Sequence, residues 1–349
     1  MYTNKNDKIS LEDYKAELDN LSLNFAAILD QPLIIPKAKK TLAHHWRWND
    51  VHRILHQSLL FQDKLPTGLA GAERRIVRLQ NPGLKGETVT NTMSMSAQLL
   101  LPGEIARPHR HTPVAFRFFL KGRSFTTVHG ERNDMLPGDL VLTPYMTWHD
   151  HGNDSDEPGI WIDGLDYPLV RELDAVIKND IEEAQNIKRT GTTERRFGSA
   201  GLRPTKVTPQ ETKLSSMIHY RWVSTEAMLE KMAAADDASK NDDIMIEYVN
   251  PATGNSVFNT IGCYIQMIRP GVTTVKQREV AHKVYQVFRG SGKVVIGDQT
   301  FEYEEGDFFV IPSGSWHQHI NEGSNPTILF SLQDKPAMER LGLYSHESE

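Results

Sequence analysis

The chain has 349 residues with a formal net charge of −6, 39% hydrophobic residues and 24% charged residues. These values are typical of a globular protein long enough for two domains. The acidic balance argues against nucleic acid or an anionic membrane surface as the main partner. The single cysteine, Cys263, cannot form an internal disulfide, and no signal peptide or membrane-length apolar run is recognisable, so we expect a cytoplasmic protein.

The first 60 residues precede the first β-rich segment of the chain. LEDYKAELDNLSLNF at 11–25 is typical of a helix, so residues 1–60 are predicted to form a partly helical N-terminal arm. Short segments rich in β-forming residues and bounded by Gly or Pro follow, such as VAFRFFLKG at 114–122 and DLVLTP at 139–144. Residues 61–170 are therefore expected to form a first β domain.

Residues 171–245 are predicted to form a linker that contains helices. LVRELDAVIKNDIEEAQ at 169–185 has roughly helical spacing of its apolar residues. STEAMLEKMAAADDASK at 224–240 begins with a Ser/Thr pair suited to an N-cap and is rich in helix formers, whereas 188–201 is expected to be a loop. Strand-like segments then return, so residues 246–349 are predicted to form a second β domain.

The two β domains share an internal repeat. Glycines at 103 and 271, 122 and 290, and 138 and 306 match, as do prolines at 144 and 312, histidines at 149 and 317, and asparagines at 153 and 321. Every pair differs by 168 positions. Because glycine and proline mark the turns of β structure, matching turns predict two copies of the same fold.

Two histidines stand one residue apart in the first copy, within PGEIARPHRHTPVAFRFFLKG at 102–122. Strand residues two apart face the same side, so His109 and His111 should point together. Arg117 would share that face if the strand continued regularly, although Pro113 could disturb the register. His149 would arrive from a neighbouring strand, and a cluster of three imidazoles suits iron, zinc, copper or nickel.

These spacings resemble the two motifs of the cupin superfamily, whose members are small double-sheet β-barrels. The first copy matches at Gly103, His109, His111, Gly122, Gly138, Pro144, His149 and Asn153, with Ala115 where the motif has glutamate and Met146 where it has glycine. The second copy has Gln277, Glu279 and Lys283 at the corresponding first-motif positions. The predicted fold is therefore mainly β, a bicupin of two jelly-roll barrels with one intact and one degraded metal site. A metal could still bind Glu279 and His317, although packing and assembly is the expected role of the second barrel.

Two side-chain roles remain open from the residues alone. WHDH at 148–151 puts His149 and His151 on one face; the motif spacing favours His149 as ligand. His151 is then a hydrogen-bonding or proton-handling group, or a surface histidine at the end of the strand. Arg117 could bind a substrate carboxylate with two hydrogen bonds, or it could form a structural salt bridge with an internal acid such as Asp163.

Longer segments resemble the gentisate 1,2-dioxygenases, a group that includes salicylate and 1-hydroxy-2-naphthoate dioxygenases. The resemblance is carried by HHWRWND at 44–50, LLLPGEIARPHRHTPVAFRFFLKG at 99–122, LPGDLVLTPYMTWHDHGN at 136–153 and IWIDGLDYPLV at 160–170. It implies a non-haem Fe(II) enzyme that uses O2 to cleave a salicylate-type ring between the carboxyl-bearing and hydroxyl-bearing carbons. It also implies a homo-oligomer, commonly a tetramer.

The resemblance further implies roles for individual residues. Iron would be held by His109, His111 and His149, and Arg117 would bind the substrate carboxylate. His151 would contact substrate or oxygen, and Asp163 would orient its neighbours. Further substrate contacts are implied for Arg74, Ser94 and Gln98.

Ser94 departs from the gentisate enzymes, in which an aromatic residue is expected at this position. The small side chain should enlarge the pocket or change its polarity. Gentisate remains the first expectation, and a ring-substituted salicylate (5-halo or 5-nitro) or 1-hydroxy-2-naphthoate is the alternative. Two other classes are weaker: a non-catalytic small-molecule-binding bicupin has no need for Arg117, and a sugar-phosphate isomerase of the cupin type usually keeps the acidic ligand that Ala115 replaces.

Overall fold

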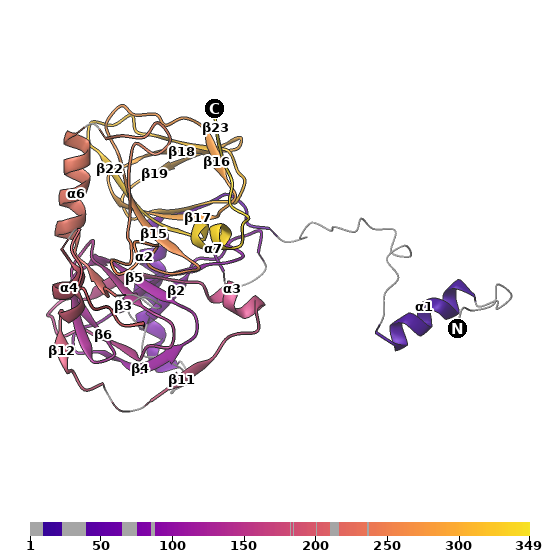
Figure 1. Ribbon diagram of the computed structural model, residues 1–349, viewed down its shortest axis with the longest axis horizontal. Helices are drawn as coiled ribbons and strands as arrows, with labels where there is room; N and C mark the ends of the chain where they lie inside the picture. The colour runs from indigo at the N-terminus through magenta and orange to yellow at the C-terminus, as the bar shows by residue number, and fades with distance from the viewer. Residues whose placement is uncertain are drawn as a thin grey trace. The chain divides into compact units, whose positions relative to one another are not determined.

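The computed structural model describes residues 10–22, 40–64, 75–84, 88–181, 183, 185–199, 201–209, 216–235 and 237–349. Residues Met1–Lys39 and Lys40–Glu349 are two separate units (Figure 1). In the first unit, helix α1 (Leu11–Asn20) begins where the Ser10 side chain accepts a hydrogen bond from the amide of Asp13. The helix predicted in the N-terminal arm is thus confirmed for those residues.

The first barrel consists of two six-stranded sheets. One sheet has the order β13-β8-β5-β10-β3-β2, formed by His219–Tyr220, Leu140–Thr143, Ala115–Lys121, Gly159–Leu165, Ser94–Leu100 and Arg75–Arg78. The other has the order β11-β4-β9-β6-β7-β12, formed by Lys178–Asp180, Ile105–His111, His149–Gly152, Ser124–Val128, Glu131–Met135 and Arg189–Thr190. Phe119, Met135, Val141 and Trp161 belong to an apolar cluster of this barrel.

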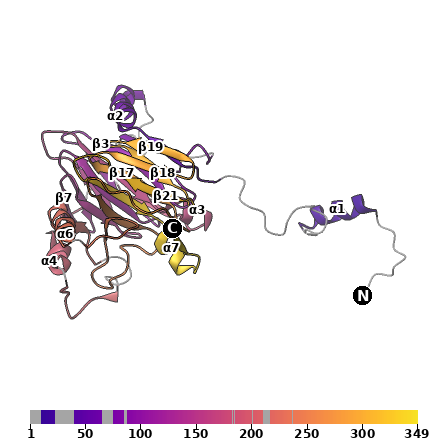
Figure 2. The ribbon, with the colours of Figure 1, turned by 90° about the horizontal axis from the view of Figure 1, so that it is seen from above.

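The second barrel repeats this arrangement. Its first sheet has the order β1-β20-β17-β22-β15-β14, formed by His44–Trp46, Phe308–Ile311, Lys283–Arg289, Thr327–Gln333, Gly262–Ile268 and Ile244–Glu247. Its second sheet has the order β19-β18-β21-β16-β23, formed by Gln299–Tyr303, Gly292–Ile296, His317–Ile320, Gln277–Glu279 and His346–Ser348 (Figure 2). The predicted bicupin fold, mainly β, is confirmed.

A shared apolar core joins the two barrels. Phe118 of the first barrel stacks on Phe330 of the second, with ring centroids 4.2 Å apart and an interplanar angle of 13°. Both rings belong to a large buried cluster drawn from both barrels, and burial of apolar surface on this scale is the main stabilising contribution to a fold. The two barrels therefore share one continuous core.

Each barrel is completed by a strand from the segment that precedes the other barrel. β1 lies before the first barrel in sequence but pairs with β20 of the second, and β13 lies before the second barrel but pairs with β8 of the first. The two strands carry related sequences, HWRW at 45–48 and HYRW at 219–222, each followed by a helix: α2 (Trp48–Gln57) and α6 (Trp222–Ala234).

A buried aspartate holds each exchanged strand. Asp307 accepts from the Trp48 amide at 2.7 Å, and its other oxygen lies 2.8 Å from His45 Nε2. Asp139 repeats this with the amide of Trp222 at 2.8 Å and His219 Nε2 at 2.9 Å. The preceding glycines are required, because a Cβ at Gly138 or Gly306 would lie within 2.6 Å of the indole atoms of Trp222 or Trp48.

Two predictions about the linker are wrong in detail. The helix predicted over 169–185 ends early: α3 spans Tyr167–Glu172, Asp174 adopts a left-handed conformation at φ 53°, and β11 follows. The apolar residues of that segment are instead largely exposed. The predicted loop at 188–201 contains β12 and the short helix α4 (Thr192–Phe197).

The second predicted linker helix is confirmed as α6, but its start is not capped by the Ser/Thr pair. The helix begins two residues earlier, at Trp222, and the N-cap residue Arg221 makes no side-chain capping bond. Asp139 of the first barrel binds the Trp222 amide instead. A carboxylate at a helix N-terminus is favourable, so a tertiary contact replaces the local cap.

Met146 occupies a backbone position that suits glycine. Its φ is 53°, whereas its counterpart Gly314 has φ 75°, and the amide of each donates to a carbonyl of the neighbouring strand end, that of His111 or Glu279. A side chain in the left-handed region costs roughly 1–2 kcal/mol. The substitution that departs from the cupin motif is therefore accommodated with strain.

We predict that Met146→Gly is more stable than Met146→Ala by about 1 kcal/mol, since both variants lose the same packing and only glycine relieves the left-handed strain. Equilibrium urea unfolding measures the difference. As a matched control, Gly314→Ala should be destabilised by about 1 kcal/mol, because no atom lies within 4 Å of the added Cβ and only the backbone is strained. An alanine variant at 146 as stable as the glycine variant would contradict this account.

Candidate active site

Three histidines of the first barrel converge on one point. His109 and His111 lie on β4, and His149 begins β9, where it stands directly opposite His109 in the strand pairing. The ligand atoms of these side chains lie within 4.8 Å of one another. This is the one group of three or more potential metal ligands found among the described residues.

The backbone fixes the protonation of all three rings. Each Nδ1 lies at hydrogen-bond distance from a carbonyl oxygen two residues away: His109 at 3.0 Å from Arg107, His111 at 2.7 Å from Pro113, and His149 at 2.9 Å from Thr147. A carbonyl can only accept, so each Nδ1 must carry a proton, and in a neutral ring Nε2 then has the lone pair. Pairs of ring centroids are 4.2 to 5.6 Å apart.

The electrostatics of this cluster favour a metal ion. His149 is fully buried, its Nε2 has no hydrogen-bond partner, and burial followed by the neighbouring histidines lowers its pKa well below the usual value. A buried polar atom without a partner is costly unless another group satisfies it. Three neutral imidazoles with converging lone pairs fit a divalent transition metal, so the donor set agrees with the predicted metal site.

His151 lies beside this cluster and outside it. Its Nδ1 is 2.8 Å from the hydroxyl of Thr126, and its ring centroid is 5.8 Å from that of His149. The side chain is completely buried, so it is not a surface histidine at the end of a strand. Of the two alternatives open from the sequence, a hydrogen-bonding or proton-handling role is therefore the one that is compatible with this geometry.

Arg117 does not lie on the same strand as His109 and His111. The segment around Pro113 ends β4 and turns the chain into β5, which belongs to the opposite sheet of the barrel. Arg117 nevertheless lines the same cavity as the histidines. The assumption of one regular strand is wrong, but the two sheets of the barrel bring the predicted residues together.

Arg117 also makes the internal salt bridge considered from the sequence. Its Nε lies 3.2 Å from Asp163 Oδ1, and its guanidinium donates to the Thr143 hydroxyl. Both charged side chains are less than 10% exposed. The pair holds the guanidinium rigidly in the cavity wall, so the structural and ligand-binding roles are compatible.

A cavity of about 380 Å³ opens beside the histidines. Its lining residues come from β2, β3, β4, β5, β10, α3 and β11, and they are Ile76, Arg78, Ser94, Met95, Ser96, Gln98, His109, His111, Arg117, Asp163, Leu165, Tyr167 and Lys178. The predicted residues Ser94 and Gln98 are among them. Gln98 is completely buried, and neither end of its amide has a hydrogen-bond partner, which leaves both ends available to a ligand.

Arg74, which the resemblance implies as a substrate contact, lies outside the described residues. Arg78, which was not predicted, lines the cavity on the same face of β2 as Ile76. Arg78 could have been predicted from the sequence, because positions 74 and 78 are four apart and would share a face of a continuous strand.

The corresponding region of the second barrel has different side chains and different contacts. The side chain of Gln277 bonds Asn241, Asp242 and His346, and Lys283 Nζ lies 3.0 Å from Glu279 Oε1 in a buried ion pair. Tyr285, at the position of Arg117, stacks on Phe309, which in turn stacks on Tyr303. Gln277 and Glu279 thus stand in place of two of the imidazoles, and a buried ammonium group lies beside them.

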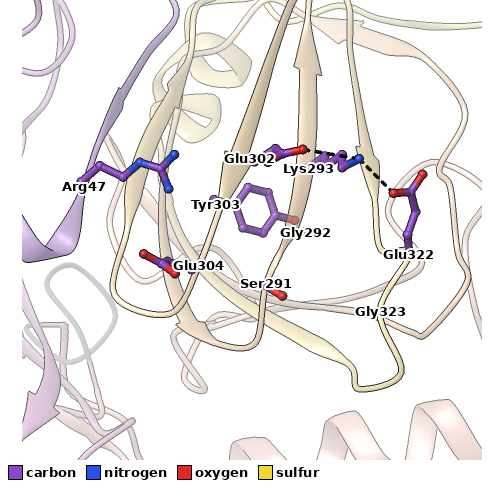
Figure 3. Close-up of a pocket in the computed structure, with 9 residues that line it drawn as sticks. All are labelled: Arg47, Ser291, Gly292, Lys293, Glu302, Tyr303, Glu304, Glu322 and Gly323. Atoms are coloured by element: carbon purple, nitrogen blue, oxygen red, sulfur yellow. Dashed lines mark ion pairs between the residues drawn. The ribbon is translucent and has the colours of Figure 1, made fainter.

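A cavity of about 330 Å³ lies elsewhere on the second barrel. Lys293, one of its lining residues, forms ion pairs with Glu322 at 2.9 Å and Glu302 at 3.5 Å. Figure 3 shows these two ion pairs. None of its nine lining residues is a histidine or cysteine. It lacks the ligand set of the first barrel, so the candidate site is the cavity beside His109.

Comparison with known proteins agrees with this assignment. The cupin domain family matches residues 97–164 and 264–332, one segment in each barrel. Gentisate 1,2 dioxygenase 1 of Aquipseudomonas alcaligenes is 38% identical over 277 residues, which are 78% of this chain and 79% of that protein. The chain belongs to the gentisate 1,2-dioxygenase family of ring-cleaving enzymes.

Other members of the family are similar along most of their length. The 1-hydroxy-2-naphthoate 1,2-dioxygenase of Nocardioides sp. (strain KP7) is 33% identical over 314 residues, which are 88% of this chain and 79% of that protein. The crystal structure of a salicylate 1,2-dioxygenase from Pseudaminobacter salicylatoxidans superimposes with a TM-score of 0.85 at 31% identity, covering 100% of this chain and 99% of that one. Within the described part of the chain, no helix is both long and apolar enough to cross a membrane.

We predict that His149→Ala abolishes metal binding, whereas His151→Ala keeps the metal and loses most of the activity. Only the first substitution removes one of the converging lone pairs. Elemental analysis after anaerobic Fe(II) loading measures the metal, with about one ion per chain expected in the wild type. His317→Ala in the second barrel is the control and should not change the metal content; a halved content in this variant would contradict the assignment to one barrel.

Proposed function

We propose that this protein is an Fe(II)-dependent dioxygenase that cleaves gentisate or a related salicylate between its carboxyl-bearing and hydroxyl-bearing carbons. The proposal is carried by one observation: three imidazole Nε2 atoms converge beside a cavity that contains a buried arginine. His109, His111 and His149 would hold the iron. When bound, Fe(II) supplies the redox chemistry that activates O2 and the chelated aromatic acid.

The residues around the histidines would bind and orient the acid. Arg117 presents its guanidinium from the sheet opposite the histidines, and a guanidinium binds a carboxylate through two charge-assisted hydrogen bonds. Asp163 would act as a positioning residue that holds Arg117. Arg78 adds a second positive charge to the cavity, and Arg74 stays a proposed substrate contact beside it in sequence. These charges favour an anionic substrate.

His151 would hold or move a proton during the reaction. Its ring lies beside His149, and the Thr126 hydroxyl at Nδ1 fixes the orientation of the imidazole. Burial excludes bulk water from this position, so a proton leaving the substrate hydroxyl needs an internal acceptor. The ring supplies such an acceptor within the barrel.

The protein is further proposed to be a cytoplasmic homo-oligomer, a tetramer by resemblance to the family. Leu42, Ile54, Leu60 and Phe61 are each 43% to 73% exposed around α2 and the short 3-10 helix Ser58–Lys64 that follows it. Exposed apolar side chains of this kind favour association between copies. Light scattering that gave the mass of a single chain would exclude it.

Oxygen uptake tests the reaction directly. Fe(II)-loaded protein should consume O2 with gentisate, salicylate, a 5-substituted salicylate or 1-hydroxy-2-naphthoate and change the ultraviolet spectrum of that acid. The uptake should disappear in the His109→Ala control. A fully loaded protein that consumes no oxygen with any of these acids would refute the proposal and favour a binding protein.

Ser94 is proposed to set the size of the substrate that fits. It lies on the inner face of β3 opposite Leu165, and the next residues on that face are Ser96 and Gln98. Two adjacent small side chains leave room for a ring substituent or a second ring. This supports an acid larger than gentisate as the alternative substrate.

We predict that Ser94→Tyr lowers kcat/KM for 1-hydroxy-2-naphthoate about tenfold relative to gentisate, because the phenol ring occupies that room. Initial rates of oxygen uptake with both acids measure the ratio. Ser324→Tyr, on an exposed loop of the second barrel, is the control for the added ring. An unchanged preference in the Ser94 variant would count against this role.

A further inference from the structure

Strand β11 places two charged side chains beside the histidine ligands. Lys178 is paired with His111 in the register of β11 and β4, and Asp180 is paired with His109. Directly paired residues of neighbouring strands share one face of the sheet. Arg110 and Asn179 lie between these two pairs and face the other side of the sheet. There, Arg110 Nε donates a hydrogen bond to Asn179 at 3.0 Å.

Lys178 differs from Arg117, the buried cation of the same cavity. Its Nζ bonds both carboxylate oxygens of Asp180, at 2.7 and 2.9 Å, and the two side chains are 42% and 58% exposed. An exposed pair of this kind contributes little to stability, and a lysine stem rotates freely. Arg117, by contrast, is buried and clamped by Asp163 and Thr143. Lys178 can therefore exchange Asp180 for another acceptor.

In the second barrel, the side chain at the corresponding strand position is held by hydrogen bonds. β23 pairs with β16 as β11 pairs with β4, and His346, 168 positions after Lys178, stands opposite Glu279. His346 Nε2 lies 3.0 Å from both Gln277 and Asn241. The first barrel thus keeps an exchangeable cation at the position where the second has a side chain fixed in a hydrogen-bond network.

We propose that Lys178 is a specificity-determining residue that binds a hydrogen-bond-accepting ring substituent, such as hydroxyl or nitro, on the aromatic acid. The inference rests on the proposed function. Lys178 and Arg117 belong to the two opposite sheets of the barrel and line one cavity. An acid whose carboxylate lies at Arg117 extends its ring into this cavity, and the ammonium of Lys178 can then exchange Asp180 for a substituent on that ring.

Oxygen-uptake kinetics of holoenzyme variants with gentisate, 5-nitrosalicylate and unsubstituted salicylate test this inference. Lys178→Met should lower kcat/KM for the two substituted acids about tenfold, because a charge-assisted hydrogen bond to the ring substituent is lost. It should change kcat/KM for salicylate, which has no such substituent, by less than about twofold. Asp180→Asn should lower KM for the substituted acids, because it releases the ammonium. Lys231→Met on the exposed face of α6 is the control for the lost charge.

A double-mutant cycle separates this role from a structural one. In the Lys178→Met background, Asp180→Asn should have no further effect on KM, because the two residues act through one interaction. Equal losses with all three acids, or none, would overturn the inference. Absence of oxygen uptake by the wild type with every acid would refute the proposed function instead; in that case, anaerobic binding of 5-nitrosalicylate must still weaken in Lys178→Met for the inference to stand.

Discussion

The site depends on three hydrogen bonds between imidazole Nδ1 atoms and the backbone. His109, His111 and His149 each bind a carbonyl two residues away, and this fixes the ring orientation and the tautomer together. The carbonyl of Pro113 belongs to the same turn that sends the chain from β4 into the opposite sheet. One short segment therefore orients the ring of His111 and places Arg117 on the opposite wall of the cavity.

The two barrels show how one architecture supports two outcomes. The offset of 168 residues relates Gln98 to Gln266, Arg117 to Tyr285, Ala115 to Lys283 and Asp163 to Ser331. In the second barrel Lys283 supplies a buried positive charge, and Tyr285, Phe309 and Tyr303 form an aromatic stack. A buried ion pair is weak support for stability, so the stack, by apolar burial, is the larger contribution there.

The repeat, the fold and the histidine cluster were predictable because each depends on local signals. Turn glycines at fixed spacing define the strands, and residues two apart on a strand share a face. The linker was harder to predict. The apolar residues of 169–185 have helical spacing, but pairing of Lys178–Asp180 with β4 overrides the local preference. The cap of α6 could not be predicted from neighbouring residues, since Asp139 is more than 80 positions away in sequence.

The two halves are also joined by reciprocal hydrogen bonds at the ends of the barrels. Thr260 donates to Asp166 at 2.7 Å, and Thr92, 168 positions earlier, donates to Asp334 at 2.5 Å. Burial raises the pKa of Asp166 to about 6 despite this bond and that from Val114.

These contacts, together with the exchanged strands β1 and β13, mean that the order of segments along the chain differs from their order in space. A cut between the barrels would leave each fragment carrying a strand that belongs to the other. The smallest independently folding piece of this architecture is therefore the pair, and a duplicated gene that acquired this exchange could no longer lose either copy without losing both.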